Sequence, residues 1–460
     1  MSSAGYPFAS LIELLAGCRI ETGPGESLAF SEYARSAENA VGDAFPAVVA
    51  GQGILVDSGA SLLSRVIGLW KAGAVPVVVP APLSAGAMPS VHWDWRGDMP
   101  VRLAADPPSL VSGQDCPAII HLSSGSTGLP RPAPRSTASL LAEAGRYVSR
   151  YGLSPGERVL VAAPICHSFG FGAFLGAAAA GGVVSLPTAF HARRLARRLC
   201  AGAFDVAVLT VPMARLLIAA AGPDRASGGS KARLAIVGAG PVSDRLAAAF
   251  EQSFGCPLGR NYGSSETGAT FGAATALPEG VIGRPFDGVR IVAPSVPGET
   301  AELVLDLGHA VLASTSAAGA SQIWRTGDRA TLLAGDSIRL HGRLDDRLKL
   351  DGRTIDGAAV VAAALAVPCV RDAVAIATVA PWAPDRDLLV VACEGSGVDR
   401  EHVRVAVAAT NAPAPLVLTF ASLPRTAAGK PDRAAIVAAV AGDQPRADRD
   451  ITPVVREPVP

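Results

Sequence analysis

Apolar residues recur along the chain in two patterns, one with helical spacing and one in short continuous runs. Ser61–Ala72 has the helical spacing and stops before Gly73, and the apolar run Val75–Val79 follows as a buried strand. Pro117–Leu122 is a second such run, and the next helix is predicted to begin at about Ser136. Strands that alternate with helices predict an α/β fold with doubly wound, mostly parallel sheets.

The alternation continues through two further strands and a helix closed by Gly255, at Arg158–Ala163, Arg233–Val237 and Asp244–Phe254. After about residue 300 the strands become short and polar at their edges, as in Ser337–Leu340. We therefore predict a large N-terminal α/β domain, a small α+β C-terminal domain and a polar, Pro-rich tail that we expect to be disordered, at residues 1–344, 345–441 and 442–460.

Charge and composition exclude several classes of function. The 40 basic and 40 acidic residues balance, which argues against a nucleic-acid partner, and the 7 cysteines form no CxxC pair, as in a reduced cytoplasmic protein. No Asp, Glu, Lys or Arg occurs in residues 159–192, but prolines and glycines interrupt this stretch. We expect a buried segment there and no membrane span.

A loop rich in Ser, Gly and Thr follows the strand that ends near Leu122. It reads SSGSTGLPR from Ser123 to Arg131. Such a loop can direct successive backbone N–H groups and hydroxyls toward phosphate oxygens, although Gly/Ser-rich segments are also common as flexible solvent loops. It lacks the GxxxxGK[ST] pattern of a Walker A loop.

Four more short motifs follow in order, at Asn261–Gly268 (NYGSSETG), Trp324–Asp328 (WRTGD), His341–Gly352 (HGRLDDRLKLDG) and Pro424–Arg433 (PRTAAGKPDR). Together with the Ser/Gly/Thr loop, this series resembles the adenylate-forming superfamily of acyl- and aryl-CoA synthetases, peptide-synthetase adenylation domains and luciferase-like enzymes. The resemblance extends from about Ile54 to Val440. It implies ATP-dependent activation of a carboxylic acid as acyl-AMP, followed by acyl transfer to a thiol.

The resemblance implies a nucleotide site assembled from all five motifs and a Gly-Ala-Gly segment. Its residues are Ser123, Ser124, Gly125, Ser126, Thr127, Gly128, Arg131, Gly238, Ala239, Gly240, Asn261, Tyr262, Gly263, Ser264, Ser265, Asp328, Arg343 and Lys430. Within this set, Thr127 and its loop would hold the β- and γ-phosphates, Tyr262 would stack on adenine, and Ser265 would contact the α-phosphate. Asp328 and Arg343 would bind the ribose.

The same resemblance implies the catalytic groups and a moving C-terminal domain. Lys430 would stabilise the charge that develops when a carboxylate attacks the α-phosphorus, and Glu266 would ligate Mg²⁺. Asp345 would be the hinge about which a mobile C-terminal domain rotates. Lys349 and Gly352 would then line the channel for a thiol, either that of CoA or that of the phosphopantetheine of a separate carrier protein.

His167 falls where acyl- and aryl-CoA synthetases often have a catalytic or pocket histidine; the alternative is a buried histidine satisfied by the backbone. With Phe169, Gly170, Phe171, Gly238 and Gly263 it would bind an aromatic or short- to medium-chain acid, although these aromatics are equally typical of core packing. Two alternatives stay open for the whole chain. One is a catalytically inactive nucleotide- or acyl-adenylate-binding homologue, and the other is a luciferase-like oxidase.

Overall fold

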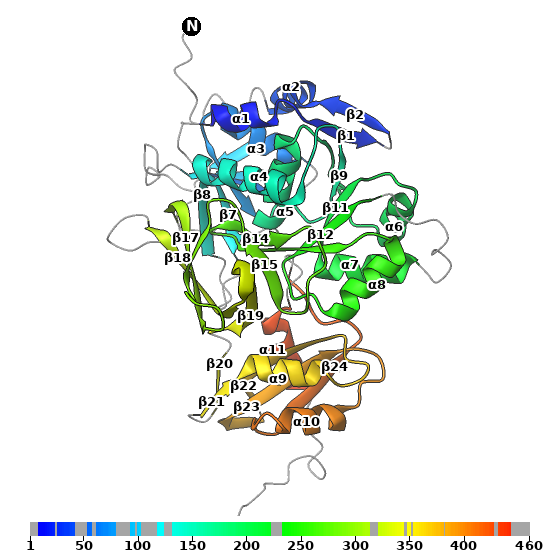
Figure 1. Ribbon diagram of the computed structural model, residues 1–460, viewed down its shortest axis with the longest axis vertical. Helices are drawn as coiled ribbons and strands as arrows, with labels where there is room; N and C mark the ends of the chain where they lie inside the picture. Colours follow the sequence, from blue (N-terminus) through cyan, green and yellow to red (C-terminus); the bar gives the residue numbers. More distant parts are fainter. Residues whose placement is uncertain are drawn as a thin grey trace, which may run out of the picture. The chain divides into compact units, whose positions relative to one another are not determined.

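The computed structural model describes residues 8–23, 25–41, 53–57, 61–79, 93–96, 99–102, 117–123, 131–221, 232–312, 321–344, 347–350, 353–380, 382–426 and 431–442 (Figure 1). Backbone contacts group them into two compact units. The larger unit contains the described residues up to His341, and the smaller unit contains those from Gly342 onward. The predicted tail lies outside the described residues, apart from Gly442.

The first sheet of the larger unit has six strands in the order β6-β5-β3-β4-β7-β8. Their bounds are Gly53–Asp57 (β3), Val75–Val79 (β4), Trp93–Arg96 (β5), Met99–Arg102 (β6), Pro117–Ser123 (β7) and Arg131–Ser136 (β8). Strand β3 pairs in parallel with β4 and β5, and β4 pairs in parallel with β7. The predictions of β4 and β7 are confirmed.

Strand β8 was not predicted, because we expected the helix to follow the Ser/Gly/Thr loop directly. It pairs antiparallel with β7 and lies at the edge of the sheet. Pro132 and Pro134 lie in this strand, and their presence argued against predicting a strand there. Proline lacks the N–H needed in a central ladder, but an edge strand tolerates it.

The second sheet has 13 strands in the order β16-β17-β18-β19-β15-β14-β13-β12-β11-β9-β10-β1-β2. Their bounds are Arg19–Gly23 (β1), Glu26–Ala29 (β2), Arg158–Val161 (β9), Val183–Ser185 (β10), Val206–Thr210 (β11), Leu234–Gly238 (β12), Leu258–Ser264 (β13), Gly268–Ala273 (β14), Val281–Pro285 (β15), Arg290–Ala293 (β16), Thr300–Val311 (β17), Ser321–Leu332 (β18) and Ile338–Arg343 (β19). The run from β1 through β10, β9, β11 and β12 to β13 is parallel.

Beyond β13 the second sheet is antiparallel, through β14 and β15 to β19 and among β16, β17 and β18. The α/β class is confirmed, but this sheet is mixed rather than mostly parallel. The expectation of short strands after residue 300 holds for β19, which has 6 residues and overlaps the predicted Ser337–Leu340, but not for β17 and β18, which have 12 residues each. Their interrupted apolar patterns follow from register shifts along the β17–β18 pair, which break the alternation that identifies a long strand.

Eight α-helices and a short 3₁₀ turn accompany these sheets among the described residues. They are Ala9–Leu15 (α1), Phe30–Val41 (α2), Leu62–Lys71 (α3), Thr137–Tyr151 (α4), Ser168–Ala179 (α5), Ala192–Cys200 (α6), Val211–Ala221 (α7), Asp244–Phe254 (α8) and Ala334–Asp336 (η4). The uncharged stretch folds into the 12-residue α5 and its flanking strands. No helix in the described chain is long and apolar enough to span a membrane.

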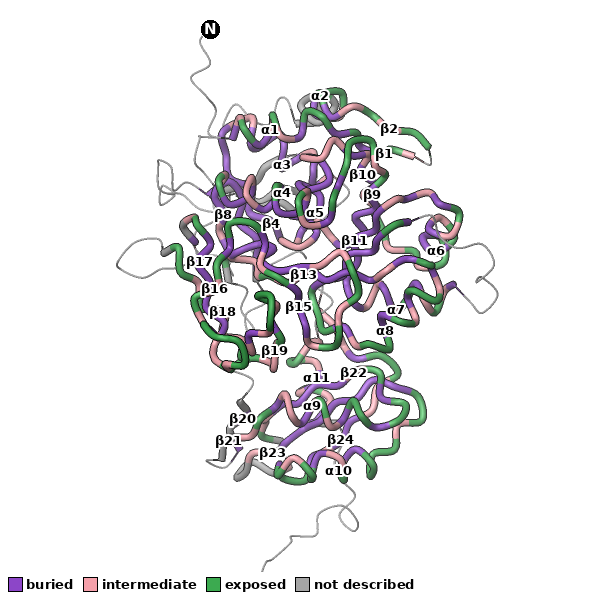
Figure 2. The backbone as a smooth tube through the Cα atoms, in the orientation of Figure 1, coloured by how far each residue is buried: buried purple, intermediate pink, exposed green. Residues whose placement is uncertain are grey.

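Helix ends follow the local chemistry that the sequence indicated. Ser136 caps α4 by accepting a hydrogen bond from the Ser139 N–H, and Gly152 ends the helix at a φ of 58°. Tyr147 of α4 and Phe174 of α5 are fully buried, and burial of each such side chain contributes roughly 2 kcal/mol. Figure 2 shows central strands such as β4 and β11 buried along their length.

The smaller unit contains five strands and three helices among its described residues. They are Arg347–Leu350 (β20), Arg353–Asp356 (β21), Gly357–Leu365 (α9), Asp372–Ala380 (β22), Ala383–Glu394 (β23), Arg400–Ala408 (α10), Leu416–Phe420 (β24) and Arg433–Gly442 (α11). Alternate residues of β23 enter two separate cores. Val391 packs in the cluster that contains Val360 and Val403, and Val390 packs in the cluster that contains Ile436. This two-sided packing fits the predicted α+β class.

Candidate functional site

The Ser/Gly/Thr loop is held at its base by two paired strands. Ser123, the last residue of β7, pairs with Arg131, the first residue of β8. The two described residues that flank the loop are therefore paired, at one edge of the first sheet. The loop residues predicted to hold phosphate, Ser124, Gly125, Ser126, Thr127 and Gly128, lie outside the described residues.

The turn between β13 and β14 carries the predicted metal ligand. Ser264 and Thr267 close this turn, since the Ser264 N–H donates to the Thr267 Oγ1 at 3.3 Å and the Thr267 N–H donates to the Ser264 Oγ at 3.2 Å. Ser265 and Glu266 lie between them and are half-buried. No described residue forms an ion pair with Glu266.

Tyr262 and Asp328 meet although 66 residues separate them in the chain. The Tyr262 hydroxyl donates a hydrogen bond to a carboxylate oxygen of Asp328, and this contact joins β13 to β18. Thr326 holds the neighbouring backbone, because its Oγ1 accepts a hydrogen bond from the Asp328 N–H at 3.0 Å. The two side chains that the motifs assigned to adenine and ribose are thus brought together.

Asn261 points into the core rather than standing free beside Tyr262. Its Nδ2 donates to the Tyr151 hydroxyl at 3.0 Å, and that hydroxyl donates to the Arg260 carbonyl at 2.8 Å. Burial, opposed by the Asn261 hydrogen bond, raises the pKa of Tyr151 above its usual range. Asn261 therefore fixes the backbone of β13 next to Tyr262.

At the predicted acid pocket, α5 packs against the end of β12. A Cβ at Gly238 would lie 3.0 Å from the Phe169 ring and 3.2 Å from the Asn261 carbonyl oxygen, so the aromatic ring packs directly on the glycine backbone. His167 precedes α5 as its N-terminal cap residue, and Ala239, with a φ of 61°, turns the chain away from β12. Phe169 and His167 are half-buried and lie at the edge of the core.

Phe171 lies deeper, among other aromatic side chains. Its ring centroid is 6.0 Å from that of Trp70, 5.4 Å from that of His121 and 6.2 Å from that of Phe174, and it is 2% exposed. Of the two interpretations of these aromatics, core packing describes Phe171 and Phe174. Phe169 is the aromatic side chain that remains accessible beside Gly238.

Several buried polar residues were missed by the sequence analysis. His121 is 1% exposed, and burial, with the nearby charge of Arg135 and then His167, lowers its pKa to about 3. Arg135, Glu143 and Arg146 are also buried, on β8 and α4. One signal was available, because Glu143 falls on the apolar face of α4, beside Leu140, Ala144 and Tyr147 in helical spacing.

In the smaller unit, the described residues include the base of the Lys430 loop but not Lys430 itself. Arg425 and Pro431 form an isolated β-bridge. Arg425 is anchored by Asp372 at 2.7 Å and by Glu394 at 3.0 Å. Burial lowers the pKa of Arg425, but these two carboxylates outweigh it and the net shift is upward. The loop that carries Lys430 is therefore fixed at its base.

Other predicted residues of the smaller unit are placed only in part. Arg343 ends β19 and is exposed. Lys349 lies in the β20–β21 hairpin, opposite Thr354. Asp345, Gly352 and Lys430 lie outside the described residues.

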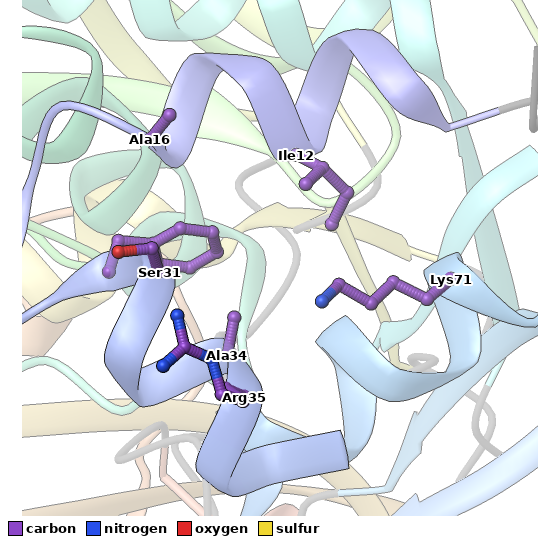
Figure 3. A pocket seen from close by; sticks show the side chains of 7 residues that line it. Ile12, Ala16, Ser31, Ala34, Arg35 and Lys71 are labelled. Atoms are coloured by element: carbon purple, nitrogen blue, oxygen red, sulfur yellow. The ribbon is translucent and has the colours of Figure 1, made fainter. Parts of the chain in front are cut away.

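A separate hollow of about 250 Å³ lies between α1, α2 and α3 of the larger unit (Figure 3). Ile12 and Ala34 line it together with the cationic side chains of Arg35 and Lys71. None of the residues predicted for the nucleotide or the acid lines this hollow. It does not correspond to the predicted site.

The Glu266 carboxylate fits the way Mg²⁺ is usually held, by few protein ligands. Within the described parts of the chain, no group of three or more His, Cys, Asp or Glu residues is arranged to hold a metal ion. Mg²⁺ typically needs one or two carboxylates, with phosphate oxygens and water completing its shell. A half-buried carboxylate on a rigid turn satisfies that requirement.

Comparisons with known proteins bear on the family and the fold of the chain. Residues 90–308 match the family model described as AMP-binding enzyme. The chain is 28% identical over 407 residues to a probable 2-succinylbenzoate–CoA ligase of Mycobacterium tuberculosis, an alignment that covers 83% of this chain and 94% of the ligase. It superposes on ATP-bound MatB from Rhodopseudomonas palustris with a TM-score of 0.74, over 94% of this chain and 98% of that one, at 16% identity.

A third relative is much longer than this chain. The sequence is 27% identical over 423 residues to a probable nonribosomal peptide synthetase, CymA, of Salinispora arenicola. The alignment covers 84% of this chain but 5% of the synthetase. This chain therefore corresponds to one small part of that protein.

Proposed function

We propose that the chain activates a carboxylic acid with ATP as acyl-AMP and passes the acyl group to a thiol, because residues 90–308 match an AMP-binding enzyme model and the chain has the fold of ATP-bound MatB. The relatives support an AMP-forming ligase of the acyl- or aryl-CoA type at the level of the family. The observation that carries the proposal is the meeting of Tyr262 and Asp328 beside the turn that holds Glu266.

The nucleotide is proposed to bind along β13 and β18. Asp328 accepts hydrogen bonds from the ribose hydroxyls while the Tyr262 hydroxyl orients its carboxylate, and the Tyr262 ring faces adenine. Ser265 contacts the α-phosphate, and the Ser/Gly/Thr loop holds the β- and γ-phosphates. Glu266 would hold Mg²⁺, which neutralises phosphate charge when bound.

Adenylation joins two anionic groups, so positioned positive charge is its main requirement. The carboxylate oxygen attacks the α-phosphorus, the bond to the bridging oxygen breaks, and pyrophosphate leaves with that electron pair. Lys430 is proposed to stabilise the charge in the transition state. Loss of one such contact typically costs about 10²–10³ in rate.

The acid is proposed to lie against Phe169 and the Gly238 backbone, with His167 at the mouth of the pocket. The ring packed on glycine offers a flat apolar surface, which suits an aromatic acid or a short to medium acyl chain. The acceptor is CoA or the phosphopantetheine of a carrier protein. The relative named as a CoA ligase supports CoA as the acceptor, and the relative named as a peptide synthetase supports a carrier protein.

Acid-dependent ATP–pyrophosphate exchange with Mg²⁺ tests the proposal. We expect exchange with one class within a panel of aromatic and short- to medium-chain acids, and a loss of about 10²-fold or more in Lys430→Ala. Lys71→Ala, on α3, is the matched control and should retain the full rate. ATP binding without exchange across the panel would instead indicate an inactive nucleotide-binding homologue.

A further inference from the structure

A buried ion pair lies between β8 and α4 in the larger unit. The Arg135 Nη2 is 3.1 Å from the Glu143 Oε2, and each side chain is 1% exposed. Desolvation of two charges is costly, and a well-packed apolar pair is often as stable. The presence of this pair in the core is therefore not explained by stability alone.

Helix α4 also holds the backbone of Ala269 on both sides. The Ala269 N–H donates to the Glu143 Oε1 at 2.8 Å, and the Ala269 carbonyl accepts from the Arg146 Nη1 at 3.3 Å. Glu143 and Arg146 are three positions apart and so share one face of the helix. Ala269 lies beside the register shift between β13 and β14, where regular strand pairing is interrupted.

Two glycines make room for the carboxylate of Glu143. A Cβ at Gly268 would lie 2.4 Å from the Glu143 Oε2 and 2.6 Å from the Arg135 Nη1. A Cβ at Gly172 of α5 would lie 2.2 Å from the Glu143 Oε1. Gly268 follows Glu266 by two residues, so the ion pair directly abuts the end of the turn.

We propose that Glu143 and Arg146 are positioning residues for adenylation, a role that rests on the proposed function. Both side chains fix Ala269, and Arg135 balances the buried charge of Glu143. The turn closed by Ser264 and Thr267 is then held at its C-terminal end, which sets the direction of Glu266. In the proposed function this turn supplies one carboxylate, that of Glu266, to Mg²⁺. A small displacement of this carboxylate should therefore lower the rate of adenylation and leave the binding of the acid unchanged.

Two double variants separate positioning from core packing. Arg135→Met with Glu143→Leu removes both charges and the acceptor for the Ala269 N–H. Arg135→Met with Glu143→Gln removes both charges but keeps an oxygen acceptor. We expect the first to lower the exchange kcat at least tenfold and to raise the Mg²⁺ concentration needed for half-maximal rate, with the KM for the acid unchanged. The second should stay within about threefold of the wild type.

Hydrogen–deuterium exchange supplies a readout that does not depend on activity. Peptides covering residues 262–271 should exchange about tenfold faster in the Leu double variant than in the Gln double variant, while peptides from α8 stay unchanged. Phe250→Leu, a fully buried change on α8 in a separate core cluster, controls for general destabilisation. Arg146→Gln tests the carbonyl side of Ala269 with the ion pair intact, and should also accelerate exchange.

Equal exchange and equal Mg²⁺ dependence in the two double variants would overturn the positioning role and leave the pair as core packing. The positioning role is also overturned if Phe250→Leu reproduces the Mg²⁺ effect. A wild-type protein without pyrophosphate exchange would reject the proposed function, and the hydrogen exchange of residues 262–271 would still decide whether α4 fixes the turn.

Discussion

At the scale of single residues, the contact between Tyr262 and Asp328 makes the sharpest prediction about the nucleotide. Asp328→Ala should raise the KM for ATP by about 10–100-fold, since hydrogen bonds to a charged group contribute roughly 1.5–3 kcal/mol. Tyr262→Phe keeps the ring but removes the hydroxyl that orients the carboxylate, and should raise that KM about 3–10-fold.

Deoxy analogues of ATP test whether the Asp328 carboxylate binds the ribose hydroxyls. The wild type should discriminate against 2′-deoxy-ATP, and Asp328→Ala should lose most of that discrimination, as measured by kcat/KM for the two nucleotides. If Asp328→Ala discriminates as well as the wild type, Asp328 does not bind the 2′-hydroxyl.

His121 makes a prediction about stability and pH. Its pKa in the folded protein, about 3, is below the ordinary value of 6.5 because of burial and the nearby Arg135 and His167. The unfolded chain therefore binds more protons between these values, and stability is lost as the pH falls through 6.5 toward 3. From pH 7 to 5, the free energy of unfolding should fall about 2 kcal/mol more in the wild type than in His121→Leu. Parallel pH profiles from urea titrations would contradict this assignment.

The residues of the candidate site differ in how far a local sequence pattern points to them. Tyr262, Asp328 and Glu266 lie in short motifs that are rich in polar residues. Packing of a hydrophobic core does not explain such motifs, so they point to a functional site. Arg135, Glu143 and Ala269 meet only through the packing of α4 against a bulged hairpin, across 126 residues between the last two. Such a contact depends on tertiary register, which no local pattern encodes.

At the scale of elements, prediction succeeded where local chemistry and periodicity agree. Helix α8 begins after the Ser243 cap and ends at Gly255, whose φ of 67° suits glycine. Strand β8 was not predicted because its prolines argue against a strand, except where the strand lies at the edge of a sheet. Edge position is a property of the whole sheet, so only the structure could supply it.

The base of the Lys430 loop gives an element-scale prediction. Arg425→Ala leaves Asp372 and Glu394 without their shared cation, which should destabilise the smaller unit by about 1–3 kcal/mol. Because the loop loses its anchor, the exchange kcat should fall about tenfold while the KM for ATP changes little. The measurements are thermal unfolding and initial rates at saturating acid.

Arg371→Ala is the matched control for this prediction. The Arg371 Nε lies 3.6 Å from the Glu394 Oε1, but the side chain is 52% exposed, so its loss should cost no more than about 1 kcal/mol. An equal loss of kcat in both variants would show that Arg425 acts through general stability rather than through the loop.

At the scale of the whole molecule, the chain has separate cores on either side of a short linking segment. Two hydrophobic clusters use described residues up to Ile338, and two others use those from Leu348 onward. No cluster among the described residues draws on both sets. Independent cores are a physical requirement for the proposed rotation about Asp345, because each unit must keep its own packing.

Substitution at Asp345 tests that rotation. Proline fixes φ near −65° and should hold the two units in one orientation, whereas Asp345→Ala leaves the backbone free. We expect Asp345→Pro to lower one half-reaction at least tenfold more than the other, and Asp345→Ala to lower neither by more than about twofold. Pyrophosphate exchange measures the first half-reaction, and single-turnover transfer from preformed acyl-AMP to CoA measures the second. Equal losses in the proline variant would mean that Asp345 is not the hinge, because a fixed orientation can serve only one of two chemically distinct steps.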